Sequence, residues 1–404
     1  MDDGDHAIVD ADRHVSEPLG MWLEYLDPEL RVHAPRMRET DTQLAMARRV
    51  RELGARAAVP LLPELTVDGL PLFAGWGLEL QLEASRQSRQ HAQEIDKATS
   101  GAGQLAAMDA AGVAEAYLFP THATFLVHHE QLAAPVSAGF ARAYNRWLRD
   151  YCAVDPTRLH PVGVVSRHDP AMTLAELDRI IDHGWRCVVM RPEPILGLGL
   201  GDPRLEPFWT RCEQASIAVA IHGSTHLFGP TIGRDRFTTR FALHACAHPM
   251  EAQLAFLSLL DAGVLERHPR LRVAFLEAGA SWVPHWLWRL DEICYATMPG
   301  ENARNVTMKP SRYFARQCWV GIELEEPCLR QVIDMIGADR LLYGTDFPHP
   351  DHLPVIADDS PGGPSGPRQR PEHGRTLWSG GDLREHERKL VFGDNARAFF
   401  EGAR

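Results

Sequence analysis

Eight short apolar runs constrain the fold of this chain, because each is followed by a polar or Gly/Pro break and then by a longer stretch of helical periodicity. Near-continuous apolar strands that alternate with helices are typical of a parallel sheet that is covered on both faces. Eight such units favour a closed barrel over an open sheet. We therefore predict an α/β fold, a (β/α)8 TIM barrel, formed by one domain that spans residues 1–404. The expected strands are residues 7–12, 113–119, 160–165, 186–191, 217–222, 272–277, 317–322 and 340–346.

Two further segments do not fit the repeat, and a third closes the chain. Residues 31 to about 104 separate the first two strands, and we expect a helical insertion there that serves as a lid or a dimer contact. Residues 357 to about 382 follow the eighth strand and are rich in proline and glycine, which predicts a loop near the face where βα loops build active sites. Residues 383–404 are expected to form a C-terminal helix.

The charge balance favours a small molecule as the partner. Lys and Arg total 42 and Asp and Glu total 54, so the net charge of −12 lacks the basic surface that nucleic acids or anionic membranes need. No apolar run approaches the roughly 20 residues that span a bilayer. The seven cysteines contain no Cys-x-x-Cys motif, which fits a reducing compartment. We expect a cytoplasmic homodimer that binds neither nucleic acid nor a membrane.

Residues that can bind a metal ion stand at the carboxyl ends of the expected strands. Asp12 and His14 share one face of the first strand, since side chains alternate along a strand. His222 and Asp346 end the fifth and eighth strands, and in a barrel these ends converge at one mouth. The four side chains could hold one divalent ion and leave a position open for substrate or water. We expect zinc, with manganese, iron or magnesium as alternatives. No lysine lies in an expected strand to bridge a second ion.

Other polar residues near the mouth are candidates for catalysis or substrate binding. Asp346 and Glu277, at the end of the sixth strand, are candidate acid/base groups. The histidines after the fifth strand could orient substrate or donate a proton, or fill polar loop and cap positions. Arg191 could clamp a substrate carboxylate or form a structural salt bridge, His349 could position Asp346 or the substrate, and Glu17 could support the metal site or hold a loop. The loop histidines are His226, His244 and His248, with His226 assigned to substrate binding and the other two to catalysis.

Several motifs together resemble a known family. They are Val9-Asp10-Ala11-Asp12-Arg13-His14 with Glu17-Pro18, Met108 to Val113, Gly263 to Pro269, Leu276-Glu277-Ala278-Gly279, and Gly344-Thr345-Asp346-Phe347-Pro348-His349. This chain is similar to the amidohydrolase-related family that includes aminocarboxymuconate-semialdehyde decarboxylase and the hydroxybenzoate-type decarboxylases. The resemblance implies a metal-dependent barrel that decarboxylates its substrate, or hydrolyses a C–N, C–O or C–C bond, with Asp12, His14, His222 and Asp346 as ligands. Two positions depart from the family pattern, which usually has His or Glu at Asp12 and often a catalytic His at Glu277.

Three functions follow, and the first is our expectation. The first is non-oxidative decarboxylation of a small carboxylated aromatic or cyclic compound, in which Asp346 protonates the carbon that bears the carboxylate. The alternative is hydrolysis of an amide, ester, lactone, thioester or C–C bond, in which Asp346 or Glu277 takes a proton from an attacking water. The third is a barrel that binds a ligand without catalysis.

Overall fold

Eight parallel strands form the centre of the molecule. The computed structural model describes residues 7–38, 64–73, 88, 90–224, 229–298, 300–323, 326–349 and 383–402. The strands neighbour one another in chain order, as the sequence predicts for a (β/α)8 barrel, and each overlaps one of the expected runs. They are β1 (Ile8–His14), β5 (Val113–Phe119), β6 (Leu159–Val164), β7 (Cys187–Met190), β8 (Ala218–His222), β9 (Val273–Leu276), β10 (Cys318–Ile322) and β11 (Leu341–Tyr343).

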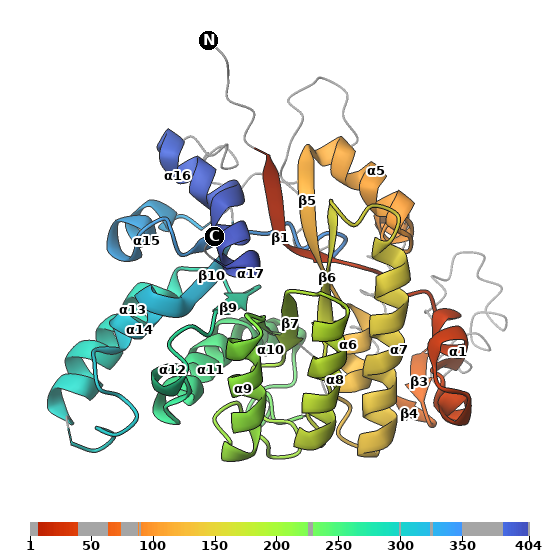
Figure 1. The fold of residues 1–404 in the computed structure, drawn as a ribbon, viewed down its shortest axis with the longest axis horizontal. Helices are drawn as coiled ribbons and strands as arrows, with labels where there is room; N and C mark the ends of the chain where they lie inside the picture. The colour runs from red at the N-terminus through yellow and green to blue at the C-terminus, as the bar shows by residue number, and fades with distance from the viewer. Residues whose placement is uncertain are drawn as a thin grey trace, which may run out of the picture.

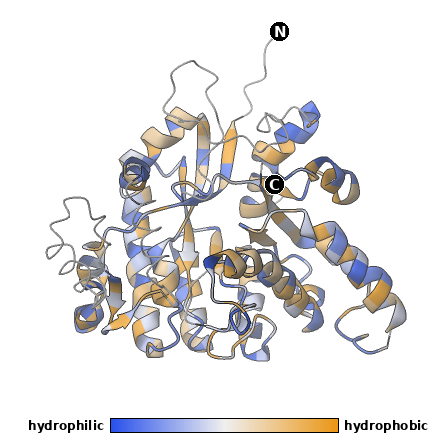
Figure 2. Ribbon diagram, turned by 180° about the vertical axis from the view of Figure 1, so that it is seen from behind, coloured by the Kyte–Doolittle hydropathy of each residue, from blue (hydrophilic) through white to orange (hydrophobic). Residues whose placement is uncertain are grey.

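Helices surround these strands (Figure 1). Helix α7 illustrates why a helix packs against the strands. Its residues Phe140, Tyr144 and Leu148 recur every four residues, share one face and are all fully buried. Figure 2 shows apolar residues concentrated on the strands, whereas the outer helices carry both kinds of residue. The helices are α1 (Met21–Tyr25), α4 (Ala92–Lys97), α5 (Gly101–Ala111), α6 (His122–Val127), α7 (Ala134–Cys152), α8 (Pro170–Asp182), α9 (Glu206–Gln214), α10 (Arg240–Ala247), α11 (Pro249–Asp261), α12 (Val264–Arg267), α13 (Trp282–Trp288), α14 (Pro310–Gln317), α15 (Leu329–Ile336), α16 (Glu385–Lys389) and α17 (Asn395–Glu401), with 3₁₀ helices η1 (Pro28–His33) and η2 (Pro203–Leu205) and π-helical turns η3 (Arg289–Tyr295) and η4 (Leu390–Asp394).

The first and last strands meet through the residues at their carboxyl ends. The backbone N–H of His14 donates to the carbonyl oxygen of Phe347 at 2.7 Å, and the N–H of Asp346 donates to the carbonyl oxygen of Asp12 at 2.8 Å. Gly344 permits this approach, since a Cβ atom there would lie 2.5 Å from the Cβ of Asp12. These two hydrogen bonds therefore link the ends of the strand order beside the residues that we expect to bind metal, although β1 and β11 share no strand ladder among the described residues.

The insertion between β1 and β5 differs from the expectation of a helical segment. Its described part contains a three-stranded antiparallel sheet as well as helices α4 and α5. The strands are β2 (Arg36–Arg38), β3 (Glu64–Val67) and β4 (Leu70–Pro71). Asp68 and Gly69 both have positive φ between β3 and β4, which forms the tight turn of a hairpin that periodicity alone did not reveal.

The remaining segments are only partly described. The Pro/Gly-rich segment at 357–382 and the candidate residue His226 lie outside the described residues. The C-terminal helix expected at 383–404 is a helical run from α16 through η4 to α17, beside β1 (Figure 1). Within the described ranges, no helix is both long enough and apolar enough to span a membrane.

Candidate metal centre

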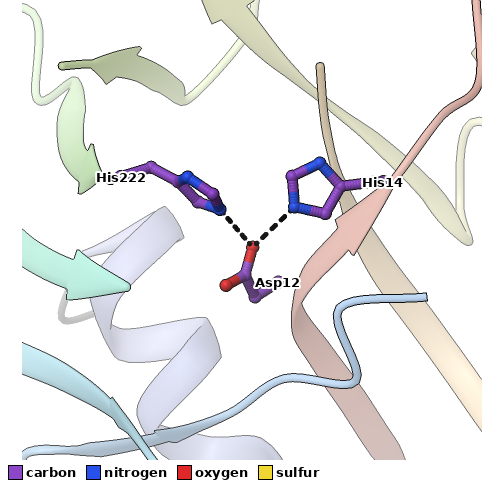
Figure 3. Close-up of side chains that lie close together, drawn as sticks. All are labelled: Asp12, His14 and His222. Carbon is purple, nitrogen blue, oxygen red and sulfur yellow. Dashed lines mark ion pairs between the residues drawn. The ribbon is translucent and has the colours of Figure 1, made fainter. Parts of the chain in front are cut away.

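Three of the four expected ligands form one compact group at the mouth of the barrel. The Oδ1 atom of Asp12 lies 3.5 Å from Nε2 of His14 and 3.5 Å from Nε2 of His222. Figure 3 shows the Asp12 carboxylate between the two imidazoles, with β1 and β8 supplying the three side chains. All three residues are buried. Their ligand atoms lie close enough together to share one ion.

Both imidazoles are oriented by backbone carbonyl groups. Nδ1 of His14 lies 2.9 Å from the carbonyl oxygen of Pro120, and Nδ1 of His222 lies 2.8 Å from that of Gly223. An N–H at each Nδ1 donates to its carbonyl, so Nε2 faces Asp12 and offers a lone pair whenever the ring is neutral. Neither Nε2 atom has a hydrogen-bond partner among the described residues. This arrangement is the one that metal-binding histidines adopt.

Asp346 approaches the group from the end of β11. Its Oδ1 atom lies 3.1 Å from Nε2 of His14 and 2.7 Å from Nδ1 of His349. His14, Asp346 and His349 thus form a second group of possible ligands. The two groups share Nε2 of His14, and one nitrogen lone pair binds one ion, so they are alternatives or parts of a single site.

The charges of this site depend on its burial and on its own members. Burial raises the pKa of Asp12, but the neighbouring imidazoles of His222 and His14 lower it overall. Burial likewise opposes ionisation of Asp346, yet His349 and His14 bring its pKa well below the usual range. Burial lowers the pKa of His14, whereas Asp12 and Asp346 raise it well above normal. The two carboxylates therefore attract a positive charge, and a divalent cation fits that requirement.

Glu277 also lies close to His222, and His248 lies close to Glu277. The Oε2 atom of Glu277 is 3.4 Å from Nε2 of His222 and 3.7 Å from Nδ1 of His248. The imidazoles of His248 and His244 have centroids 4.7 Å apart. Burial lowers the pKa of His248 well below its usual range, and the charges of His244 and His222 act in the same direction. His248 is therefore a neutral imidazole at physiological pH.

A cavity of about 540 Å³ opens beside these residues, which is a usual size for a small-molecule site. It is lined by Asp12, His244, His248, Glu277, Glu323 and Asp346, among others. Two of the candidate ligands, Asp12 and Asp346, thus share one space with the candidate acid/base groups.

Arg191 makes the structural salt bridge that was one of its two expected roles. Its Nε and Nη2 atoms donate to Oε1 and Oε2 of Glu193 at 3.0 and 3.2 Å, and Nη2 also donates to the carbonyl oxygen of Ser224 at 3.3 Å. Its Nη1 atom is buried and has no hydrogen-bond partner in the described part of the chain. Only this nitrogen remains for a substrate.

Glu17 holds the loop that follows β5. Its carboxylate accepts the N–H groups of Thr121, His122 and Ala123 at 2.9–3.1 Å, at the beginning of α6. The hydroxyl of Thr121 lies 2.9 Å from Nε2 of His349. A chain of contacts from Glu17 to Thr121, from Thr121 to His349 and from His349 to Asp346 therefore connects Glu17 with the candidate metal centre.

Phe119 is a site residue that sequence reasoning missed. Its ring centroid lies 5.9 Å from that of His14 and 5.7 Å from that of His222. The ring packs against both imidazoles and restricts their rotation. Its position at the very end of an expected strand was the available signal, but a phenylalanine has no ligating or ionisable group that would mark it as a site residue.

Comparison with known proteins supports the fold and the family. The amidohydrolase family profile matches residues 9–402. The 2-amino-3-carboxymuconate-6-semialdehyde decarboxylase of Dictyostelium discoideum is 26% identical over 211 residues, which cover 52% of this chain and 56% of that protein. The match thus spans little more than half the length of that relative.

Two solved structures share this architecture. An amidohydrolase from Mycobacterium avium subsp. paratuberculosis K-10 has a TM-score of 0.69 and 19% identity, over 98% of this chain and 99% of its own. The dihydroxybenzoic acid decarboxylase from Polaromonas sp. JS666, with manganese and the inhibitor 2-nitroresorcinol bound, has a TM-score of 0.63 and 19% identity, over 77% and 89%. At these identities the likeness shows the fold.

Proposed function

Because the chain belongs to the amidohydrolase family, we propose that it is a decarboxylase that requires one divalent metal ion and acts on a small carboxylated aromatic or cyclic compound. The observation that carries the proposal is the group of Asp12, His14 and His222. A buried carboxylate that lines a cavity and lies between two carbonyl-oriented imidazoles is costly to maintain without a cation. The decarboxylase from Dictyostelium and the one from Polaromonas support the reaction class.

The residues that would hold the ion are Asp12, His14, His222 and Asp346. Zinc is compatible with two imidazoles and two carboxylates, and the manganese in the Polaromonas decarboxylase supports manganese as well. When bound, such an ion polarises the oxygens of the substrate and stabilises negative charge that develops on them.

The protein's own residues would move the proton. Asp346 is ionised at neutral pH, because its pKa lies well below the usual range despite burial. It must therefore first accept a proton from solvent, and it then delivers that proton to the carbon that bears the carboxylate; the bond to the carboxylate breaks, its electron pair stays with the substrate, and carbon dioxide leaves. His349, whose Nδ1 is 2.7 Å from Oδ1 of Asp346, holds the carboxylate in place for this transfer.

A hydrolase is the second candidate, and one observation favours it. Glu277 places a carboxylate 3.4 Å from Nε2 of His222, where a base could take a proton from an attacking water. The same cavity would then receive an amide, ester, lactone or thioester. The homodimer and the cytoplasmic location stay predictions.

The test is product analysis with purified, metal-loaded protein. We expect carbon dioxide to be released from one or more members of a panel of hydroxybenzoates and related acids, and the Asp346→Asn variant to lower kcat by about 100-fold or more. The Leu23→Ala variant, which alters an exposed side chain, is the control. Turnover of esters or amides without any carbon dioxide release would establish the hydrolase instead.

A further inference from the structure

Glu277 has the same unusual backbone conformation as Asp346, one of the expected ligands. Both are non-glycine residues with positive φ, 50° for Glu277 and 52° for Asp346. This left-handed conformation is unfavourable for side chains other than glycine and persists where the surrounding structure enforces it. The two residues follow β9 and β11, and both face the cavity at the mouth of the barrel. The fold thus presents Glu277 and Asp346 to the mouth in the same manner.

The spacing of Glu277 from His222 is that of two ligands of one ion. Donor atoms about 2.1 Å from a metal, at tetrahedral or octahedral angles, lie about 3.0–3.4 Å apart. The Oε2 atom of Glu277 lies 3.4 Å from Nε2 of His222, and Oδ1 of Asp12 lies 3.5 Å from the same nitrogen. That Nε2 atom is buried and has no hydrogen-bond partner among the described residues. Glu277 therefore approaches His222 as closely as Asp12 does. It lies outside both groups of residues whose ligand atoms are mutually close, so its carboxylate has to turn towards Asp12 and His14 when an ion binds.

We propose that Glu277 is a ligand of the metal ion, in addition to Asp12, His14, His222 and Asp346. The proposal rests on the metal site of the proposed function and extends it. Three carboxylates and two imidazoles form an oxygen-rich set that suits manganese or another ion with six ligands better than tetrahedral zinc.

His248 completes this part of the site. Its Nδ1 atom lies 3.7 Å from Oε2 of Glu277, and it has no hydrogen-bond partner in the described segments. At this distance Nδ1 of His248 is a close neighbour of the Glu277 carboxylate but not its hydrogen-bond partner.

Manganese binding to the metal-free protein tests the proposal without an activity assay. Titration with MnCl2, followed by the electron paramagnetic resonance signal of free Mn²⁺, gives Kd for the wild type and for Glu277→Gln, Asp12→Asn and Glu323→Gln. Glu323 lines the same cavity at the end of β10, so its variant controls for the loss of a nearby negative charge. We expect Glu277→Gln to raise Kd by about tenfold or more, and Glu323→Gln to change it by less than about twofold.

The outcomes separate this inference from the function on which it rests. A Kd for Glu277→Gln within about twofold of the wild type, together with weak binding by Asp12→Asn, overturns the role of Glu277 and leaves the metal site intact. Wild-type protein that binds Mn²⁺ no better than Asp12→Asn overturns the metal site itself. Equal losses in Glu277→Gln and Glu323→Gln also overturn ligation, because they show an effect of charge alone.

A further measurement and a substitute variant address ligation directly. The visible absorption spectrum of bound Co²⁺ reports the ligand set, and it should change in Glu277→Gln and stay unchanged in Glu323→Gln. If Glu277→Gln does not fold, as judged by circular dichroism, Glu277→Asp replaces it, since that variant keeps the charge but shortens the side chain. Wild-type affinity and an unchanged Co²⁺ spectrum in Glu277→Asp would refute the proposal.

Discussion

The backbone N–H of Asp346 donates to the carbonyl oxygen of Asp12 at 2.8 Å, so residues from the two ends of the barrel's strand order are fixed against each other. The side chains of both residues approach Nε2 of His14, Asp12 at 3.5 Å and Asp346 at 3.1 Å. The backbone contact that joins the two ends of the strand order thus lies within the candidate metal centre. Changes at the junction between β1 and β11 should affect both stability and metal binding.

Asp12 is expected to be essential for binding the ion. Asp12→Asn removes the negative charge between the imidazoles of His14 and His222, so the protein should retain less than about a tenth of an ion per chain, against about one in the wild type. Elemental analysis after dialysis measures the content. An equal metal content in wild type and variant would refute this prediction.

Gly344 is expected to tolerate no side chain. In Gly344→Ala the new Cβ would lie 2.5 Å from Cβ of Asp12 and 3.2 Å from its backbone nitrogen, so β1 and β11 must separate. We expect the free energy of unfolding to fall by about 1–3 kcal/mol and metal affinity to fall with it. Urea denaturation and metal titration measure the two effects. Gly199→Ala is the matched control, because no atom lies within 4 Å of its added Cβ.

Asp10 is expected to be a stability residue close to the site. Its carboxylate lies 3.2 Å from Nη1 of Arg13 and accepts the N–H of Thr345 at 3.0 Å, and Asp10 and Arg13 are both fully buried. Asp10→Asn leaves a buried guanidinium without its counter-charge and should destabilise the fold by about 3–5 kcal/mol.

A double-mutant cycle tests the pairing of Asp10 with Arg13. Asp10→Asn combined with Arg13→Met should cost less than the sum of the single changes, since the unpaired charge is gone. Chemical denaturation of the four proteins gives the coupling energy. Strict additivity would contradict the prediction.

Glu115 is expected to make the stability depend on acid pH. Hydrogen bonds from His160 and Arg397 lower the pKa of Glu115 from 4.5 to about 2, although partial burial acts in the opposite direction. A pKa that is lower in the folded state stabilises the fold at any pH above the unfolded-state pKa of Glu115. This stabilisation is lost as the pH falls from 4.5 to about 2. The wild type should therefore exceed Glu115→Gln in stability at neutral pH and lose this advantage towards pH 2. Urea denaturation across this range measures it, with exposed Glu29→Gln as control.

The alternation of apolar runs and helical periodicity was enough to predict the barrel, because burial of parallel strands on both faces leaves a strong local pattern. The same pattern gave the ends of the strands, and therefore Asp12, His14 and His222 as neighbours. It did not reveal the hairpin of β3 and β4 in the insertion, since two short strands carry little periodicity. It also did not reveal the partner of Arg191, because an arginine near a mouth can pair with a protein carboxylate or with a substrate.

The sequence by itself determined the order of the strands and the kinds of residue at their ends, since both depend on local composition and the right-handed connection of parallel strands. The tertiary structure decided the distances among those residues. Only the folded chain shows that Asp346 contacts His349 as well as His14, that Phe119 packs against two imidazoles, and that Glu277 lies beside His222. Apart from the local pair of Asp346 and His349, these contacts join strands that are far apart in the sequence. The positive φ of Glu277 and Asp346, which no residue pattern predicts, directs both side chains to the mouth.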